Sequence, residues 1–164
     1  MIVIDEFIRK ETFPQVQDIF LNDKNFYWSW SNVVDDNTCD EIDNHQFFHM
    51  FYYEHSPVSK YWSYVVPILR KLDAKAIYSV KANCNVRTQN IVRHGFHVDV
   101  PANYNSKTAI LYINTNNGYT EFENGERVES VANRLVLFDS ELKHTGTTCT
   151  DQQRRVVLNL NYID

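Results

Sequence analysis

The sequence predicts an α+β protein, mainly β, in which a jelly-roll core is braced by helices near the N-terminus. Residues 11–21 and 58–72 carry apolar side chains at helical spacing. From residue 76 onward, short runs of β-favouring residues alternate with polar turn clusters. Helices followed by many short strands favour an antiparallel sandwich with helices on one side, and a double-sheet jelly roll is the commonest way to close such strands.

Each predicted helix has one apolar face. In the first, Phe13, Val16 and Phe20 fall close to one side, and in the second the same spacing runs from Trp62 to Leu72. The strands are predicted from residue type, since aromatic and β-branched residues are enriched in sheets. The predicted strands are residues 26–34, 46–53, 77–80, 94–98, 108–114, 134–138 and 156–162.

Composition favours one ordered domain. The chain has 164 residues, of which 43% are hydrophobic, and only 4 Gly and 4 Pro, which argues against disorder and low-complexity linkers. We expect a single domain over residues 1–164. Within it, residues 1–75 form a helix-rich support, and residues 76–164 form the jelly-roll core that carries the functional site.

The charge balance and the cysteines limit the partners and the location. With 16 basic and 21 acidic residues the net charge is −5, and no basic run is present, so we expect no nucleic-acid and no membrane partner. No stretch approaches the roughly 18 apolar residues of a spanning helix, and residues 1–7 have no basic flank followed by an apolar run, so we expect the protein not to be exported. Cys39, Cys84 and Cys149 are odd in number and widely spaced, which indicates reduced thiols in the cytoplasm.

Two His and one Asp form the candidate metal site. In a strand, His97 and Asp99 point to the same face while Val98 points away. His144 follows the apolar run 135–138, where that strand ends, and offers a third ligand. Two His and one carboxylate are the facial triad of non-haem iron oxygenases. Taken alone, the His97 and Asp99 pair has a simpler interpretation, a surface His beside a capping Asp.

The last predicted strand adds a cation. One of its faces carries Arg155, Val157, Asn159 and Asn161, and the other is apolar. An Arg at the head of the polar face could pair bidentately with the carboxylate of a dicarboxylic co-substrate. Strand parity also allows Arg154 to point inward instead, but Arg155 is favoured because it shares its face with the two amides.

The order and spacing of these features resemble the iron(II)- and 2-oxoglutarate-dependent dioxygenases. The prolyl-hydroxylase branch is the most similar, together with small oxygenases of that type carried by bacteriophages, which would place the protein in a host cytoplasm. The resemblance runs from about Gly95 to Tyr162. It rests on His97-Val98-Asp99, residues 109–114, 118–122 and 135–139, His144 and Arg155.

The resemblance implies a double-stranded β-helix, the cupin-like jelly roll, and a role for each matching residue. His97, Asp99 and His144 would hold Fe(II), and Arg155 and the Tyr112 hydroxyl would bind the far carboxylate of 2-oxoglutarate. Asn161 and Asn159 would border the metal or the co-substrate, or serve as ordinary strand amides. The implied reaction consumes O2 and 2-oxoglutarate, releases succinate and CO2, and hydroxylates a substrate C–H.

The substrate and the class keep alternatives. A peptidyl side chain, proline first, is the leading substrate, and a free amino acid or other small metabolite is the runner-up. A cupin-like metal-binding protein without 2-oxoglutarate chemistry is the alternative class, and it would need neither Arg155 nor Tyr112. The oligomeric state is not encoded in the sequence.

A few other polar residues border these motifs. Asn83 and Arg87, in the polar segment 81–88, and Tyr104 are weaker candidates for the substrate side of the site. His94 lies three residues before His97 and is expected to point outward. The three histidines at positions 45, 49 and 55 are expected to be structural or exposed.

Overall fold

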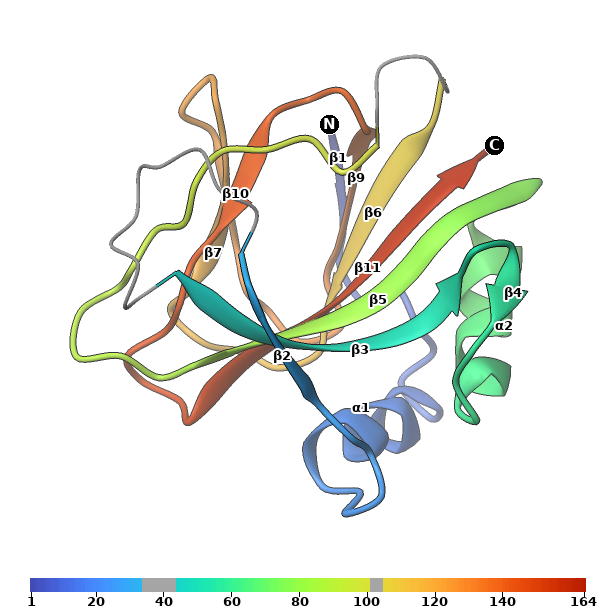
Figure 1. Cartoon of the computed structure of the whole chain (residues 1–164), viewed down its shortest axis with the longest axis horizontal. Coiled ribbons are helices and arrows are strands. Elements are labelled where there is room, and N and C mark those ends of the chain that lie inside the picture. Colours follow the sequence, from blue (N-terminus) through green and yellow to red (C-terminus); the bar gives the residue numbers. More distant parts are fainter. Residues whose placement is uncertain (34–43, 101–104) are drawn as a thin grey trace.

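A computed structural model describes residues 1–33, 44–100 and 105–164 of the chain (Figure 1). The described residues form two helices and eleven strands. These are β1 (Ile2–Ile4), α1 (Phe13–Leu21), β2 (Ser29–Asn32), β3 (His45–Tyr53), β4 (Ser56–Pro57), α2 (Trp62–Lys71), β5 (Ala76–Val86), β6 (Lys107–Tyr112), β7 (Tyr119–Phe122), β8 (Arg127–Glu129), β9 (Leu135–Asp139), β10 (His144–Gly146) and β11 (Arg154–Ile163).

The strands form a large and a small antiparallel sheet. The large sheet has the order β1-β9-β6-β11-β5-β3-β2, with β4 paired to β3, and the small sheet has the order β10-β7-β8. In Figure 1 the small sheet lies on one side of the large sheet and the two helices lie on the other. This is the jelly-roll core braced by helices that the sequence predicts.

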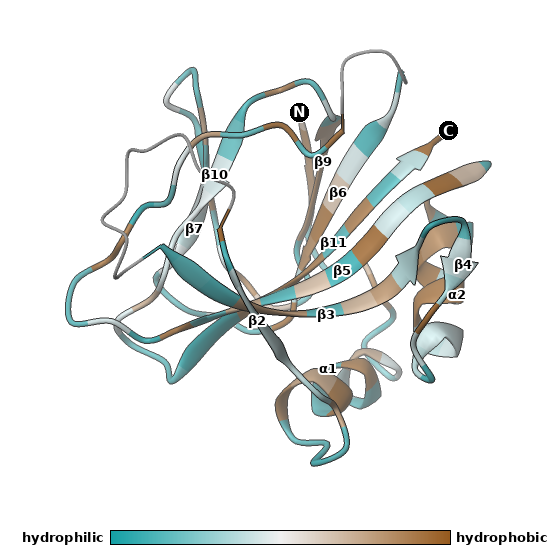
Figure 2. Cartoon of the chain, in the orientation of Figure 1, coloured by the Kyte–Doolittle hydropathy of each residue, from teal (hydrophilic) through white to brown (hydrophobic). Residues whose placement is uncertain are grey.

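Two apolar clusters hold these layers together. The first packs α1 and α2 against the large sheet, with Phe20, Val65 and Leu158 among its members. The second lies between the two sheets and includes Phe122 and Phe138, whose rings meet edge to face at 5.0 Å. Figure 2 shows hydrophobic and hydrophilic residues alternating along β5 and β11, as strands that separate an apolar from a polar layer require.

Both predicted helices are confirmed, although each is shorter than its apolar pattern. α1 begins at Phe13, with Pro14 in its first turn, where a missing N–H costs nothing. α2 begins at Trp62 and contains Pro67. The predicted strands have counterparts in β2, β3, β5, β6, β9 and β11, and the exception is the segment 94–98.

Two details of the predicted strand pattern are wrong. Residues 94–98 form no regular strand, because only isolated bridges at Arg93 and His97 pair this segment with its neighbours. The predicted strand 77–80 is too short, since β5 runs from Ala76 to Val86 and includes most of the polar segment 81–88. Its polar residues alternate with buried Ala82 and Cys84, which is the pattern of a strand with one polar face.

The first 75 residues contribute to the sheet as well as to its support. β1 pairs with β9 at one edge of the large sheet, and β3 pairs with β5 near the other. The sheet that carries the pocket described below is therefore built from both halves of the chain.

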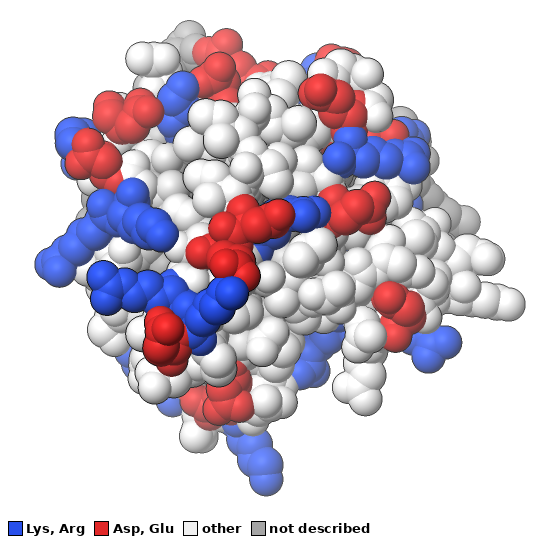
Figure 3. Space-filling model, turned by 180° about the vertical axis from the view of Figure 1, so that it is seen from behind, with Lys and Arg blue, Asp and Glu red and all other residues white. Residues whose placement is uncertain are grey.

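The surface carries charges of both signs. On the face that Figure 3 shows, Lys and Arg are interspersed with Asp and Glu. Several exposed side chains form ion pairs, such as Lys143 with Glu123 at 3.1 Å. Within the described residues, neither helix has the length and apolar character needed to span a bilayer.

The packing of β11 predicts a large stability effect at Leu158. This side chain is fully buried, and Leu158 is paired with Ala82 of β5 on one side and with Leu111 of β6 on the other. We expect Leu158→Ala to lower the free energy of unfolding by about 2–5 kcal/mol, because the substitution leaves a cavity that the sheet cannot close. Urea denaturation measures the change. Val58→Ala, at a side chain that is 56% exposed, is the control and should change stability by less than about 0.5 kcal/mol.

Candidate metal centre

Reciprocal backbone hydrogen bonds bring His97 and His144 together. The His97 N–H donates to the His144 carbonyl and the His144 N–H donates to the His97 carbonyl, both at 3.0 Å. Residues that exchange both bonds in an antiparallel pair have their side chains on the same face. The two imidazole rings accordingly lie with centroids 4.8 Å apart.

Asp99 completes the group. Its Oδ1 lies 3.8 Å from His97 Nε2, and its Oδ2 lies 3.4 Å from His144 Nε2. The three potential ligand atoms lie within 4.8 Å of one another. His97 and Asp99 therefore converge as predicted, and His144 is the third member of the group.

A hydrogen bond at Nδ1 fixes the orientation of each imidazole ring. The Nδ1 of His97 lies 3.1 Å from the Gly95 carbonyl, and the Nδ1 of His144 lies 3.1 Å from the Leu142 carbonyl. A carbonyl accepts only, so each Nδ1 carries the proton and each Nε2 presents a lone pair toward Asp99. This is the tautomer that metal-binding histidines adopt when their other nitrogen bonds to a carbonyl.

The electrostatics keep the group ready for a cation. Burial alone would raise the pKa of the Asp99 carboxyl, but the proximity of His144, and then of Lys81 and His97, holds that pKa well below its usual value. Burial, and then the proximity of His144, lower the pKa of His97. The site therefore offers a carboxylate and a neutral imidazole at neutral pH, both of which are metal-binding forms.

A chain of buried amides and hydroxyls supports Asp99. Asn159 Nδ2 donates to Asp99 Oδ2 at 2.9 Å, and Asn161 Nδ2 donates to Asn159 Oδ1 at 3.0 Å. Asn161 in turn accepts a hydrogen bond from the Thr108 hydroxyl at 2.8 Å. Asn161 was expected to border the metal or the co-substrate, but it is not among the residues that line the pocket, whereas Asn159 is.

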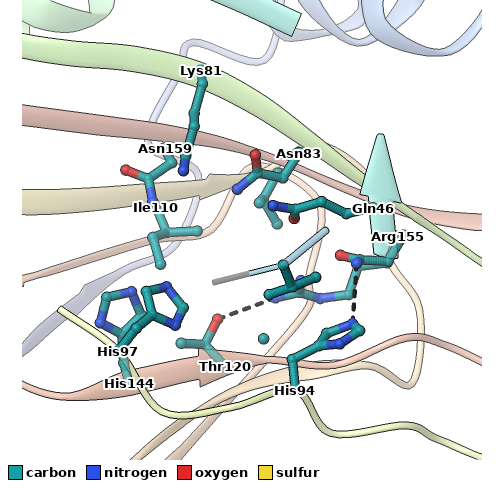
Figure 4. Close-up of a pocket in the computed structure, with 14 residues that line it drawn as sticks. Gln46, Lys81, Asn83, His94, His97, Ile110, Thr120, His144, Arg155 and Asn159 are labelled. Carbon is teal, nitrogen blue, oxygen red and sulfur yellow. Dashed lines mark hydrogen bonds between the residues drawn. The ribbon is translucent and has the colours of Figure 1, made fainter. Parts of the chain in front are cut away.

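Arg155 occupies the other end of the pocket, as Figure 4 shows. Its side chain is 3% exposed, and its guanidinium donates to Ser130 Oγ at 2.8 Å and to Thr120 Oγ1 at 3.1 Å. Among the described residues no carboxylate contacts it, and burial lowers its pKa. A buried guanidinium with only hydroxyl partners retains donors for an anion.

Tyr112 supports Arg155 without lining the pocket. Its ring centroid lies 5.6 Å from the guanidinium carbon, and its hydroxyl donates to Thr120 Oγ1 at 2.8 Å. The expected contact of the Tyr112 hydroxyl with a 2-oxoglutarate carboxylate stays a prediction, and within the described residues this hydroxyl bonds to Thr120, which lines the pocket.

A glycine makes room for the Arg155 side chain. A Cβ at Gly118 would lie 2.6 Å from the Thr148 carbonyl oxygen and 2.7 Å from Arg155 Cδ. Arg154, the alternative inward arginine, points to the other side of β11, where its guanidinium donates to the Leu21 carbonyl. The prediction from strand parity, that Arg155 and not Arg154 points into the pocket, is therefore correct.

Other polar residues of the pocket were missed or misplaced by sequence reasoning. Gln46, Lys81, Asn85 and Thr120 line the pocket, as does the weaker candidate Asn83. The alternation of polar and apolar residues in the segment 81–86 was the signal for those of β5.

The other expectations for single residues have mixed outcomes. His94 was expected to point outward, but it is 2% exposed, lines the pocket and lies 3.3 Å from the Asn85 amide. Strand parity failed there because the segment is irregular. Arg87 is exposed and outside the lining, and Tyr104 lies outside the described residues. His49 has a structural role, as expected, since it bridges the Tyr27 carbonyl and the Ser59 hydroxyl.

Comparisons with known proteins connect this architecture to solved structures. No family model and no curated protein sequence matches the chain. An oxidoreductase of the 2OG-Fe(II) oxygenase family from Burkholderia pseudomallei superposes with a TM-score of 0.69 at 6% identity, over 98% of this chain and 84% of that one.

Two prolyl hydroxylases have similar structures. A prolyl-4-hydroxylase from Pseudomonas putida gives a TM-score of 0.64 at 14% identity, over 98% of this chain and 90% of that one. A prolyl hydroxylase from Trichoplax adhaerens, solved with a peptide fragment of the hypoxia inducible factor oxygen degradation domain, gives 0.61 at 15% identity, over 99% and 83%. The chain therefore has the double-stranded β-helix, or jelly-roll, fold of these oxygenases.

Proposed function

We propose that the protein is an Fe(II)- and 2-oxoglutarate-dependent dioxygenase that hydroxylates a substrate C–H. The observation that carries this proposal is the presence, in one pocket, of a two-His-one-Asp group and a buried arginine that no carboxylate contacts among the described residues. Either feature alone occurs in other classes of protein. Together they match the needs of a metal and of a dicarboxylic co-substrate.

The residues present fit Fe(II). Two neutral imidazoles and one carboxylate are the donor set of the facial triad, which leaves coordination positions open. His97 and His144 already direct Nε2 toward the common point, because both Nδ1 atoms are held by carbonyls. Asn159 holds one oxygen of Asp99, which favours ligation through the other.

The residues also fit 2-oxoglutarate. Arg155 would bind the carboxylate far from the metal, since its remaining N–H groups form a planar donor fork that suits a carboxylate. Thr120 and Ser130 hold the guanidinium in place, and Tyr112 holds Thr120. The co-substrate would thus find an arginine that is already oriented and needs no rearrangement.

The metal and its co-substrate supply the oxidation of the C–H bond, and the chain supplies orientation and shielding. Val157 and Ile110 form apolar wall between Arg155 and the triad, and Phe138 packs edge to face on His144 at 4.8 Å. These contacts limit the access of water and fix the ligand rings. Arg155 neutralises the far carboxylate of the co-substrate within this enclosed space.

Two substrate classes follow from the sequence resemblance, a peptidyl side chain with proline first, or a free amino acid or other small metabolite. The Trichoplax adhaerens structure, which was solved with a peptide, favours the first class by analogy. The polar residues beside the triad, Lys81 and Asn83, favour the second.

Binding of the metal and the co-substrate can be tested together by visible absorption. Under anaerobic conditions, Fe(II) and 2-oxoglutarate should give the weak visible charge-transfer band of a chelated complex. The band should be absent in His97→Ala. In Arg155→Ala it should require at least about 30-fold more 2-oxoglutarate, because removal of one partner from a buried charge pair costs about 2 kcal/mol or more.

Arg154→Ala is the matched control, since Arg154 lies on the opposite face of the same strand. It should leave the 2-oxoglutarate requirement unchanged. Metal binding with no band at any 2-oxoglutarate concentration would contradict the proposal and favour a cupin-like metal-binding protein.

The hydrogen bond from Asn159 to Asp99 should contribute to metal affinity. Asn159→Leu removes the hydrogen bond to Asp99 while keeping a side chain of similar size. We expect it to weaken metal binding about 10- to 100-fold, as the loss of outer-sphere partners does. Competition with a fluorescent chelator measures the affinity. Asn85→Leu, which removes an amide that bonds to His94 instead, should keep the affinity of the unmodified protein. Equal effects of the two substitutions would show that Asn159 has no special role.

A further inference from the structure

Lys81 is a charged residue of the pocket for which the proposed chemistry gives no role. It projects from β5 into the pocket near Asn159, its partner across the strands, as Figure 4 shows. Within residues 1–33, 44–100 and 105–164, no hydrogen bond or ion pair holds its ammonium group. An ammonium group that faces a pocket with no carboxylate in direct contact can bind an anionic group of a ligand there.

Lys81 lies at the metal end of the pocket, away from Arg155. Along the paired strands, Arg155 is opposite Asn85, whereas Asn159 is opposite Lys81. The two cations are therefore separated by four residues of β5, or about 13 Å of strand at about 3.3 Å per residue. The charge of Lys81 is also felt at the triad, where it contributes to the lowered pKa of Asp99. Lys81 and Arg155 thus face different parts of the pocket.

Counted over the described residues, the charges of the loaded site would leave one positive charge uncompensated. Among the described residues, the pocket lining contains Lys81 and Arg155 and no acidic residue, and the triad adds the carboxylate of Asp99. Fe(II) adds two positive charges and 2-oxoglutarate adds two negative charges. The excess corresponds to Lys81, because Arg155 and the metal would hold the two ends of the co-substrate.

A neighbouring amide has spare hydrogen-bonding capacity. Asn83 lies two residues along β5 on the same face, and its Oδ1 is buried without a hydrogen-bond donor from any described residue. A buried polar atom without a partner indicates that a polar ligand or water completes the site. The ammonium group of Lys81 is therefore suited to an anionic group, and Asn83 Oδ1, which can only accept, is suited to a hydrogen-bond donor of the same ligand.

We propose that Lys81 binds a carboxylate of the substrate, so that the substrate is a small carboxylic acid such as a free amino acid. This inference rests on the proposed function and assigns its substrate class. A proline within a peptide chain is neutral there and would leave the ammonium group without a counterion. A free amino acid brings its carboxylate to Lys81 and holds its C–H bonds close to the triad.

The test uses Mn(II) in place of Fe(II), so that no turnover occurs, with saturating 2-oxoglutarate to occupy Arg155. The probes are the acetate anion and neutral acetamide, each labelled with 13C at its methyl group, and the neutral peptide mimic N-acetylglycinamide. Paramagnetic relaxation of each methyl signal reports binding near the metal. We expect acetate to be relaxed at least about tenfold more strongly than the two neutral probes, because hydrogen bonds to charged groups contribute about 1.5–3 kcal/mol.

Substitutions assign the effect to Lys81. Lys81→Met should abolish the preference for acetate, and Lys81→Arg should retain it. Lys75→Met is the matched control, because Lys75 lies just before the same strand, is exposed and pairs with Asp73, and it should leave the preference unchanged. Equal relaxation by acetate and the neutral probes, or an unchanged preference in Lys81→Met, would overturn the proposal.

A second measurement separates the substrate from the co-substrate. If Lys81 serves the substrate, Lys81→Met should weaken 2-oxoglutarate binding much less than Arg155→Ala does. Comparable losses would show that Lys81 binds the co-substrate and would overturn the substrate assignment. Failure of the unmodified protein to bind 2-oxoglutarate with metal would instead refute the proposed function itself.

Discussion

The paired backbone hydrogen bonds between His97 and His144 determine the geometry on which the rest of the site depends. His144 is also tied to β7, where it is the partner of Phe122. The segment around His97 is thereby attached to the small sheet, even though it forms no regular strand. The distance between the two imidazoles is set by the main chain, and side-chain contacts only need to orient the rings. Such a site keeps its shape without help from a bound ion.

The polar interior is the second constraint. β11 separates an apolar layer beneath the helices from a polar layer above it, and the same strand carries Arg155, Asn159 and Asn161 on the polar side. Buried amides and hydroxyls are tolerated in a sheet where they find partners, as Asn161 does with Thr108 and Ser79. The Lys81 ammonium group and the unpartnered Asn83 Oδ1 face the pocket, where a ligand can reach them.

The sequence was sufficient for the fold class and for the triad because both depend on regular features. The apolar spacing of the helices, the alternation in β11 and the two-residue step from His97 to Asp99 follow directly from helix and strand geometry. His94 was misplaced because parity holds only in a regular strand, and residues 94–98 are irregular. Lys81 and Asn85 were missed because a strand whose polar face lines a cavity resembles a loop in composition. Asn161 was expected to border the metal or the co-substrate, but it bonds to Asn159, which lines the pocket. This hydrogen bond depends on tertiary packing, which the sequence pattern does not show.

The place of β11 in the large sheet has a consequence for synthesis. This strand lies between β6 and β5, yet every other strand precedes it in the chain. Until the ribosome has released residues 154–163, β5 and β6 have no common partner, and the guanidinium and amide that complete the pocket do not exist. The nascent chain can form its helices and outer hairpins early, but the described pocket is complete only once residues 154–163 have joined the sheet. The buried guanidinium of Arg155 is therefore added to the pocket after His97, Asp99 and His144 have been synthesised.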